Sequence, residues 1–148
     1  MLDTVRKKGA KYVVLFDVSK AFDTVPHLSL LQKLSEIGLD PYLIRWIRSY
    51  LAGRSQFVSI DGCNSSTLPV LSGVPQGSVL GPLLFVSYIN DVATAVASDS
   101  DVNMFADDIA LYRVIRTRAD YIHLQEDVNS VSTCIGQNFF TSTLTSAN

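Results

Sequence analysis

The pattern of apolar and polar positions predicts strands and helices in alternation. A β-branched and aromatic run at 12–16 predicts a buried strand that ends at Asp17. Helical spacing of apolar residues follows at 28–34 and again at 42–51, with glycines soon after each segment. The first third of the chain therefore reads as one strand followed by two helices.

The remainder of the chain continues this mixture. Runs at 56–60 and 67–71 flank a turn at Asp61-Gly62 and predict a hairpin. A long buried helix is expected after Pro82, to about Ala97, and a last helix at 119–135. The apolar face of this last helix would consist of Tyr121, Leu124, Val128 and Val131. The fold class is α/β (α+β), with an antiparallel sheet backed by helices.

Two adjacent carboxylates mark a second hairpin. Apolar runs at 102–105 and 109–112 flank the turn that carries Asp107 and Asp108. Carboxylates at such a tip stay hydrated until a cation arrives, and hard divalent ions such as Mg²⁺ prefer oxygen ligands. A solvated loop is the simpler interpretation of this dipeptide on its own.

A third carboxylate, Asp17, makes the metal hypothesis stronger. Ninety residues separate Asp17 from Asp107, yet a strand end and a hairpin tip can lie side by side. Two metal ions about 4 Å apart, bridged by carboxylates, can clamp the attacking and leaving oxygens of a phosphoryl transfer. The alternative is that Asp17 caps the helix that follows it, because Asp is a preferred N-cap residue.

The segment 73–82 predicts a loop defined by its backbone. Three glycines and two prolines stand among its ten residues. Such a loop at a helix N-terminus lets the backbone approach a phosphate or a sugar closely. Gln76 adds an amide that can both donate and accept hydrogen bonds. An ordinary left-handed turn remains the alternative.

Together, the segments 16–23, 73–82 and 105–108 resemble the palm domain of reverse transcriptases from non-LTR (LINE-type) retrotransposons. They match the family's first three palm motifs in order and in spacing, and the resemblance runs from about residue 11 to about residue 138. It implies a polymerase palm and an RNA-directed DNA polymerase, which is a nucleotidyltransferase. Its partners would be an RNA template, a DNA primer and dNTPs, without a membrane.

The resemblance also implies metal ligands. Asp17 and Asp107 would hold two Mg²⁺ ions, for which Mn²⁺ is a possible substitute. Asp108 would support the site electrostatically or ligate one ion, and the main-chain carbonyl of Val18 would complete a coordination sphere. We expect these four residues to form the catalytic metal site.

Nucleotide-binding residues are implied in the same way. Phe22 would abut the sugar 2′ position and favour dNTPs over rNTPs, and it can serve as a core aromatic at the same time. Gln76 would contact the incoming nucleotide and the template, while Gly73 and Gly77 shape the loop. Asp23 is interpreted as structural, a cap for the helix that begins near residue 26.

Charge is unusual for a nucleic-acid enzyme. The net charge is −2, whereas proteins that bind phosphates usually carry a basic footprint. The cations form three groups: Lys7, Lys8, Lys11; Arg45, Arg48, Arg54; Arg113, Arg116, Arg118. Each group is more typical of a solvated face than of a binding patch.

The arginines at 45–54 are a special case because they interleave with Tyr42, Trp46 and Tyr50 on an amphipathic helix. This helix is the best candidate for a surface that contacts a nucleic-acid strand. The alternative, slightly favoured from sequence, is that Trp46 and Tyr50 are core residues.

Composition and the chain ends complete the expectations. Hydrophobic residues make up 47% of the 148, a surplus that suggests missing partners, yet no apolar run reaches membrane-spanning length. Cys63 and Cys134 are lone thiols, which fits an intracellular setting in the nucleus or the cytoplasm. His27 and His123 are isolated and suit surface or capping roles.

Departures from the family suggest a fragment. Few residues precede the first strand, the end at 139–148 is polar and uncharged, and no lysine follows Lys33. We expect residues 1–10 to be a remnant of the fingers connection, 11–138 the palm and 139–148 a divergent, disordered tail. The isolated chain, without fingers and thumb, is expected to be inactive. The alternative is a non-catalytic retrotransposon remnant with residual metal and nucleotide binding.

Overall fold

The computed structural model describes residues 10–97 and 99–140. Contacts divide the described residues into two compact units. Among the described residues, unit 1 comprises 10–19, 90–97 and 99–137, and unit 2 comprises 20–89 and 138–140. Each unit is described by itself below.

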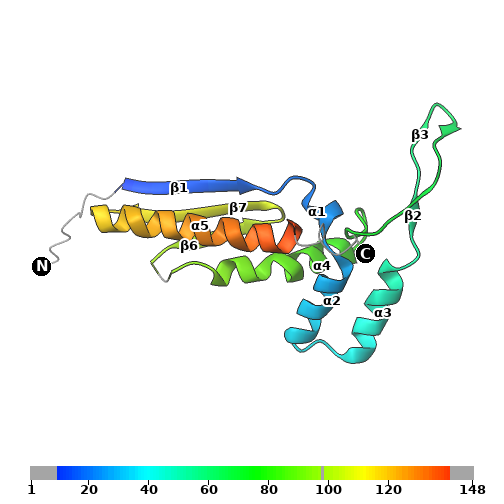
Figure 1. The fold of residues 1–148 in the computed structure, drawn as a ribbon, viewed down its shortest axis with the longest axis horizontal. Helices are drawn as coiled ribbons and strands as arrows, with labels where there is room; N and C mark the ends of the chain where they lie inside the picture. The colour runs from blue at the N-terminus through cyan, green and yellow to red at the C-terminus, as the bar shows by residue number, and fades with distance from the viewer. Residues whose placement is uncertain (1–9, 98, 141–148) are drawn as a thin grey trace, which may run out of the picture. The chain divides into compact units, whose positions relative to one another are not determined.

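Unit 1 is built on a three-stranded antiparallel sheet with the order β1-β7-β6 (Figure 1). The strands are β1 (Ala10–Asp17), β6 (Asp101–Phe105) and β7 (Asp108–Ile115). The predicted first strand and the predicted acidic hairpin are thereby confirmed. The central strand, β7, pairs with β1 along its whole length.

One face of this sheet forms the core of unit 1. Ile109 and Leu111 of β7 are buried, as expected for alternate residues on one side of a strand. The helix α5 (Arg118–Phe140) runs along the sheet (Figure 1) and buries Leu124 and Val131. Tyr121, predicted on the same helix face, is instead 56% exposed, so that part of the prediction is wrong.

A buried ion pair lies within the same core. The guanidinium of Arg113 donates to Asp127 at 3.2 Å and to Ser100 Oγ at 3.1 Å, and all three residues are buried. The prediction that Arg113 belongs to a solvated face is therefore wrong. Arg113 lies on the same inward side of β7 as Ile109 and Leu111. Its charge is therefore stabilised by the ion pair with Asp127 rather than by water.

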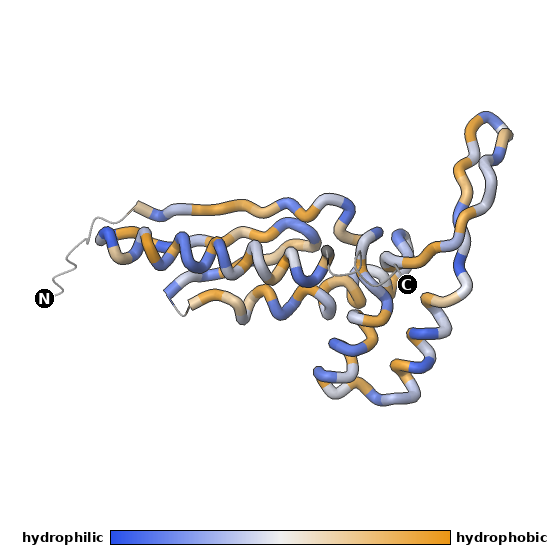
Figure 2. Tube along the Cα trace, in the orientation of Figure 1, coloured by the Kyte–Doolittle hydropathy of each residue, from blue (hydrophilic) through white to orange (hydrophobic). Residues whose placement is uncertain are grey.

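The opposite face of the sheet is open. Val13 and Leu15 of β1 are 55% and 77% exposed, although Figure 2 shows β1 as mostly hydrophobic. The prediction of a buried strand is wrong because β1 lies at an edge of the sheet. Its alternate residues Val14 and Phe16 are half-buried on the other face.

Unit 2 begins with three helices, α1 (Ala21–Thr24), α2 (His27–Glu36) and α3 (Pro41–Leu51). The two longer helices confirm the sequence prediction. Asp40 caps α3, since its carboxylate accepts a hydrogen bond from the backbone N–H of Tyr42 at 2.7 Å. Pro41 occupies the first helical turn, where its missing N–H costs nothing.

A two-part ribbon follows α3. The strand β2 (Ser55–Gln56) pairs with β5 (Leu68–Pro69), and β3 (Ser59–Ile60) pairs with β4 (Cys63–Asn64). The predicted turn is confirmed, because Asp61 and Gly62 both have positive φ, as a tight hairpin turn requires. The predicted partner runs are only partly right, since Ser59–Ile60 pairs with the residues directly after the turn.

The apolar helix α4 (Leu80–Ile89) packs against α2 in unit 2. Phe85 and Tyr88 are among its buried residues. The predicted helix to about Ala97 is wrong at both ends: α4 begins two residues before Pro82, and after Ile89 the chain tightens into a 3₁₀ helix, η1 (Asn90–Thr94).

The end of α5 belongs to unit 2. The Phe139 ring packs edge-on against Tyr88 with a centroid distance of 5.6 Å, and Lys33 Nζ donates to Asn138 Oδ1 at 2.8 Å. The helix thus extends past the predicted end at residue 135. The remainder of the predicted tail, 141–148, and the residues 1–9 lie outside the described residues. Across the described ranges, no helix is both long and apolar enough to cross a membrane.

Candidate active site

Two of the predicted metal ligands face each other across the sheet of unit 1. Asp17 is the last residue of β1, and its partner in the register is Asp108, the first residue of β7. Side chains of directly opposed residues in an antiparallel pair lie on the same face, with Cβ atoms about 5 Å apart. Both aspartates are exposed. Strand pairing thus brings two carboxylates together from opposite ends of the sequence.

Asp107 lies next to this pair in the two-residue turn between β6 and β7. Phe105 and Asp108 close the turn as the last pair of that ladder. Ala106, the first turn residue, has a positive φ of 56°, which matches the primed turns that suit the twist of hairpins. A residue with a Cβ is strained there, so the turn keeps an unfavourable conformation at the place where it presents Asp107.

The donor set of this group suits hard cations. Asp17, Asp107 and Asp108 offer only oxygen atoms, which Mg²⁺ and Mn²⁺ prefer. In the described part of the chain, however, no three His, Cys, Asp or Glu side chains converge closely enough to form a metal cage. The three aspartates form an acidic edge whose like charges repel each other. A cation between them would offset that repulsion.

The Gly73 loop of unit 2 is fixed by backbone hydrogen bonds to the segment around α1. The N–H of Gly73 donates to Val25 O at 2.8 Å, and the N–H of Val74 donates to Phe22 O at 2.8 Å. Gly73 has a φ of 87°, and a Cβ there would lie 2.7 Å from the backbone oxygen of Asp23. Glycine is therefore required at 73 for both its conformation and its size.

Side chains fasten the same loop. His27 Nε2 donates to the carbonyl of Gly73 at 2.8 Å, and Ser72 Oγ donates to the backbone oxygen of Asp23 at 2.9 Å. The amide of Gln76 donates through Nε2 to Asp23 Oδ1 at 2.7 Å. These bonds place the Gln76 side chain in a defined orientation at the edge of the loop.

Both helix-cap interpretations made from the sequence are wrong. Asp23 lies inside α1, and its carboxylate accepts from Gln76 rather than from α2, whose N-terminus has no side-chain cap. The N-cap residue of α1 is Lys20, in a left-handed conformation, rather than Asp17. The carboxylate of Asp17 is therefore not used to cap α1.

Phe22 is held by a stacked ring. Its ring lies 4.3 Å from that of Phe85, centroid to centroid, at an interplanar angle of 20°. Phe85 is fully buried in α4, whereas Phe22 is half-buried. The sequence-based interpretation of Phe22 as a core aromatic is thus partly right, and the ring keeps one side accessible.

A cavity of about 710 Å³ adjoins the loop within unit 2. Its lining includes residues of the loop, of β2 and of β5, together with Lys20, Asp23 and Arg54. In the described ranges neither Lys20 nor Arg54 has a carboxylate within ion-pair distance. Two cationic residues, Lys20 and Arg54, therefore line the same cavity as Gln76, the residue predicted to contact a nucleotide.

Sequence reasoning did not find His27 and Lys20 as residues of this region. His27 was expected in a surface or capping role, and no local pattern connects it to Gly73, 46 residues away. Lys20 could have been noticed because it lies between the predicted metal ligand Asp17 and Phe22. Gly77, by contrast, was named from the sequence, and the structure gives it a positive φ of 74° with open space around it.

Comparison with protein families matches residues 2–143 to the family described as "Reverse transcriptase (RNA-dependent DNA polymerase)". The "RNA-directed DNA polymerase from mobile element jockey" of Drosophila funebris is 38% identical over 116 residues, covering 74% of this chain and 13% of that protein. The jockey polymerase of Drosophila melanogaster is 36% identical over the same coverage. A retrotransposable element R2 polyprotein of Popillia japonica is 32% identical over 90 residues, covering 60% of this chain and 15% of that protein.

The chain thus spans about one eighth of the length of the jockey polymerases. The family match nevertheless includes the three segments that carried the resemblance seen in the sequence, 16–23, 73–82 and 105–108. The chain belongs to the reverse transcriptase family, alongside the RNA-directed DNA polymerases of non-LTR mobile elements.

Proposed function

We propose that this chain forms the palm of an RNA-directed DNA polymerase, which adds dNTPs to the 3′-hydroxyl of a DNA primer on an RNA template. The observation that carries the proposal is the pairing of Asp17 with Asp108, beside Asp107 in the turn. A structural sheet gains nothing from two carboxylates in opposed positions, because like charges there are destabilising. A cation bound between them would explain their presence in a member of the reverse transcriptase family.

In this proposal, the carboxylates of Asp17, Asp107 and Asp108 and the carbonyl of Val18 hold two Mg²⁺ ions, with Mn²⁺ as a substitute. When bound, the ions stabilise charge on the attacking 3′-oxygen and on the leaving pyrophosphate. The buried side chain of Val18 anchors the backbone directly after Asp17. The protein thus contributes a fixed acidic edge, and little covalent chemistry falls to it.

Phe22 would select the sugar. Its stacking on the buried Phe85 limits how far the ring can move when a ribose 2′-hydroxyl presses against it. A rigid ring rejects an extra hydroxyl through steric overlap, whereas a mobile ring would yield. Packing against α4 therefore supports the proposed preference for dNTPs over rNTPs.

Gln76 would contact the nucleotide and the template through the atoms that Asp23 leaves available. Its Nε2 donates to Asp23, so Oε1 and the second amide hydrogen remain for a ligand. Gly73 and Gly77 support this role by giving the loop its positive-φ turns. The loop would then act as a preformed surface rather than one ordered by substrate.

The test uses a chimera in which residues 2–143 replace the matching segment of the jockey polymerase. With Mg²⁺, we expect primer extension on poly(rA)/oligo(dT). Asp107→Ala should lower the turnover number about 10³-fold, since metal-mediated stabilisation of the transition state is worth several kcal/mol. Asp101→Asn, at the far end of the same hairpin, is the matched control and should retain activity.

The outcomes separate the two hypotheses made from the sequence. Normal extension by the Asp107→Ala chimera would overturn the assignment of the metal site. A wild-type chimera that folds and binds primer-template but never extends it would favour the non-catalytic remnant. Loss of Mn²⁺ binding in Asp107→Ala, followed on the 148-residue chain itself, gives a second readout that does not depend on turnover.

A further inference from the structure

The helix α3 presents a row of aromatic rings to solvent. Tyr42 and Trp46 are 76% and 52% exposed, and Tyr50 follows at the next helical turn, half-buried. Residues four apart lie on the same helix face. The rings of Trp46 and Tyr50 stack at 5.7 Å with an interplanar angle of 8°. The alternative that Trp46 is a core residue, favoured slightly from the sequence, is therefore wrong.

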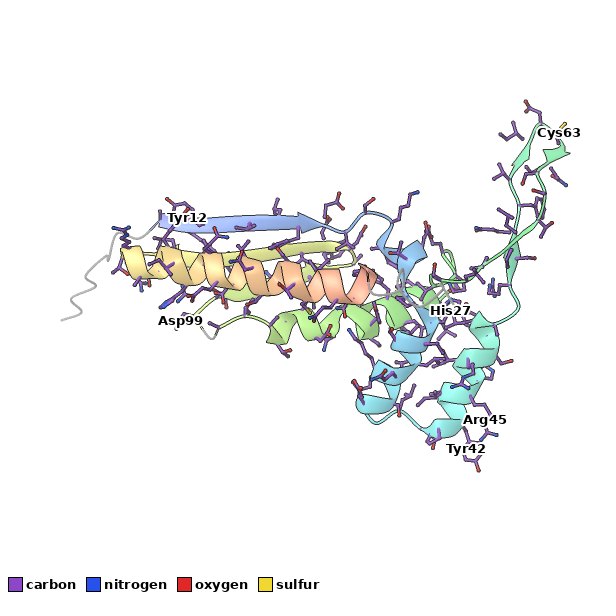
Figure 3. The ribbon with its side chains drawn as sticks, viewed as in Figure 1. Tyr12, His27, Tyr42, Arg45, Cys63 and Asp99 are labelled. Carbon is purple, nitrogen blue, oxygen red and sulfur yellow. The ribbon has the colours of Figure 1, made fainter. Side chains whose placement is uncertain are left out.

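The core face of α3 lies on the other side of the helix. Ile47 and Leu51 are buried there, so packing within unit 2 fully explains that side. It does not explain the exposed rings, because an apolar ring that stays in contact with water contributes no hydrophobic stabilisation to the fold. Figure 3 shows Tyr42 and Arg45 projecting from α3 into open space. This face is available to a partner.

Cations alternate with these rings. Arg45 lies over the Tyr42 ring at 5.2 Å, and Arg54 lies over the Tyr50 ring at 5.5 Å. From Pro41 to Arg54 the sequence holds three arginines and no acidic residue, a charge of +3 in a chain whose net charge is −2. The nearest carboxylate in sequence, Asp40, is engaged as the helix cap.

Arg54 connects this face to the cavity beside the Gly73 loop. The cavity lining includes both Arg54 and Lys20, together with Gln76. Lys20, one of the lining residues, is held in a strained left-handed conformation with φ 53°. Arg54 thus belongs both to the aromatic face, through its contact with the Tyr50 ring, and to the lining of the cavity.

We propose that the α3 face, formed by Tyr42, Arg45, Trp46, Tyr50 and Arg54, binds the single-stranded RNA template. Bases stack on the rings, and the arginines contact the phosphates, the combination by which proteins hold unpaired strands without reading their sequence. Arg54 then directs the strand toward Lys20 and Gln76. The choice of RNA rests on the proposed function, whereas the stacking and the charge complementarity rest on α3 itself.

A folded protein fits this face less well. Protein interfaces do use Trp, Tyr and Arg as anchors, but their cores are depleted of charge. On α3 each exposed ring lies against a guanidinium or against another ring. A polyanion with flat bases matches that alternation of planar groups and positive charges.

Trp46 makes the proposal directly measurable because it is the only tryptophan of the chain. Titration of the 148-residue protein with oligo(rA) in EDTA should quench its fluorescence in a saturable way. An abasic oligonucleotide with the same number of phosphates should bind about tenfold more weakly and leave the fluorescence unchanged. Duplex RNA, whose bases are already stacked, should behave like the abasic strand.

Variants divide the effect between stacking and charge. Tyr42→Ala should weaken oligo(rA) binding about tenfold, whereas Tyr121→Ala, which removes an exposed tyrosine from α5, should not. Arg45→Gln should reduce the slope of log K against log salt by about 0.7, the value for one lost phosphate contact on a single strand. Arg118→Gln removes the same charge elsewhere and should leave the slope unchanged.

The proposal is overturned by equal losses in the α3 variants and their controls, by duplex RNA binding as tightly as the single strand, or by the absence of quenching in a folded protein. Far-UV circular dichroism establishes folding for each variant, and Trp46→Phe, which keeps a ring, should retain affinity. Because EDTA removes metal ions, this binding test can succeed where the chimera assay fails, and the two proposals are judged separately.

Discussion

The acidic edge of unit 1 and the Gly73 loop of unit 2 are built in opposite ways. Asp17 and Asp108 project from regular strands, and their proximity follows from a register of eight consecutive pairs between β1 and β7. The loop has almost no regular structure of its own. It is positioned by individual hydrogen bonds: it donates to Val25 and Asp23 and accepts from His27.

This difference predicts how each region tolerates change. On the sheet, the backbone carries the geometry, so a carboxylate can be replaced while the strands stay paired. In the loop, the same atoms provide both shape and proposed function. We therefore expect stability and function to separate in unit 1 and to change together in unit 2.

Gly73→Ala should have the largest effect. The new Cβ would meet the backbone of Phe22 and Asp23 at 2.7–2.8 Å, at a φ of 87°. Overpacking and left-handed strain together should lower the free energy of unfolding by about 3 kcal/mol. Urea denaturation of the 148-residue chain measures the loss.

Gly77→Ala is the matched control for that substitution. Its φ is similar at 74°, but nothing lies within 4 Å of the position a Cβ would take. Only the conformational cost applies, about 1 kcal/mol. Equal losses at the two positions would show that the close approach to Asp23 has no importance, and the contrast between loop and sheet would weaken.

The sequence predicted the acidic edge well because its signals are local. An apolar run ending at Asp17 and a turn between two apolar runs each identify a strand end, and two strand ends readily meet. The prediction placed Asp17 near Asp107, whereas the register pairs it with Asp108. Side-chain alternation cannot reveal which strand is central, so the exposure of β1 was also missed.

The fastening of the loop could not be predicted in the same way. Its side-chain bonds join residues 46 to 53 positions apart, and no periodicity records such pairs. Asp23 was assigned to the nearest helix start because capping is the local rule for Asp. A tertiary partner, Gln76, overrides that rule in the structure.

His27→Ala should have the second largest effect. It removes the donor to the Gly73 carbonyl and leaves that acceptor poorly satisfied in a buried residue, at a cost of about 1 kcal/mol. His27→Gln, which keeps an N–H donor, should recover part of the loss. The same denaturation experiment checks both variants, and an unchanged midpoint for His27→Ala would mean that backbone bonds alone hold the loop.

Asp108→Asn should have a smaller effect on stability and of the opposite sign. Removing one of two opposed like charges should raise the free energy of unfolding by about 0.3 kcal/mol, and added salt should erase the gain. Mn²⁺ affinity should fall in the same variant, as measured by calorimetry. A destabilised Asp108→Asn with unchanged Mn²⁺ binding would indicate that the carboxylate has a structural role instead.

Asp120→Asn should have the smallest effect, and it tests the stability of unit 1 as a function of pH. The backbone N–H of Arg116 donates to the Asp120 carboxylate, as do the backbone N–H and the hydroxyl of Thr117. These hydrogen bonds lower the pKa of Asp120 below its ordinary value of 3.8. A lowered pKa in the folded state means that the carboxylate stabilises α5 at neutral pH, and that this contribution disappears as the pH falls through the folded pKa. The melting temperature of Asp120→Asn should therefore lie slightly below wild type at pH 7, and the difference should close as the pH falls through the folded-state pKa of Asp120. A gap that persists in acid would assign the effect to the shape of the side chain rather than to its charge.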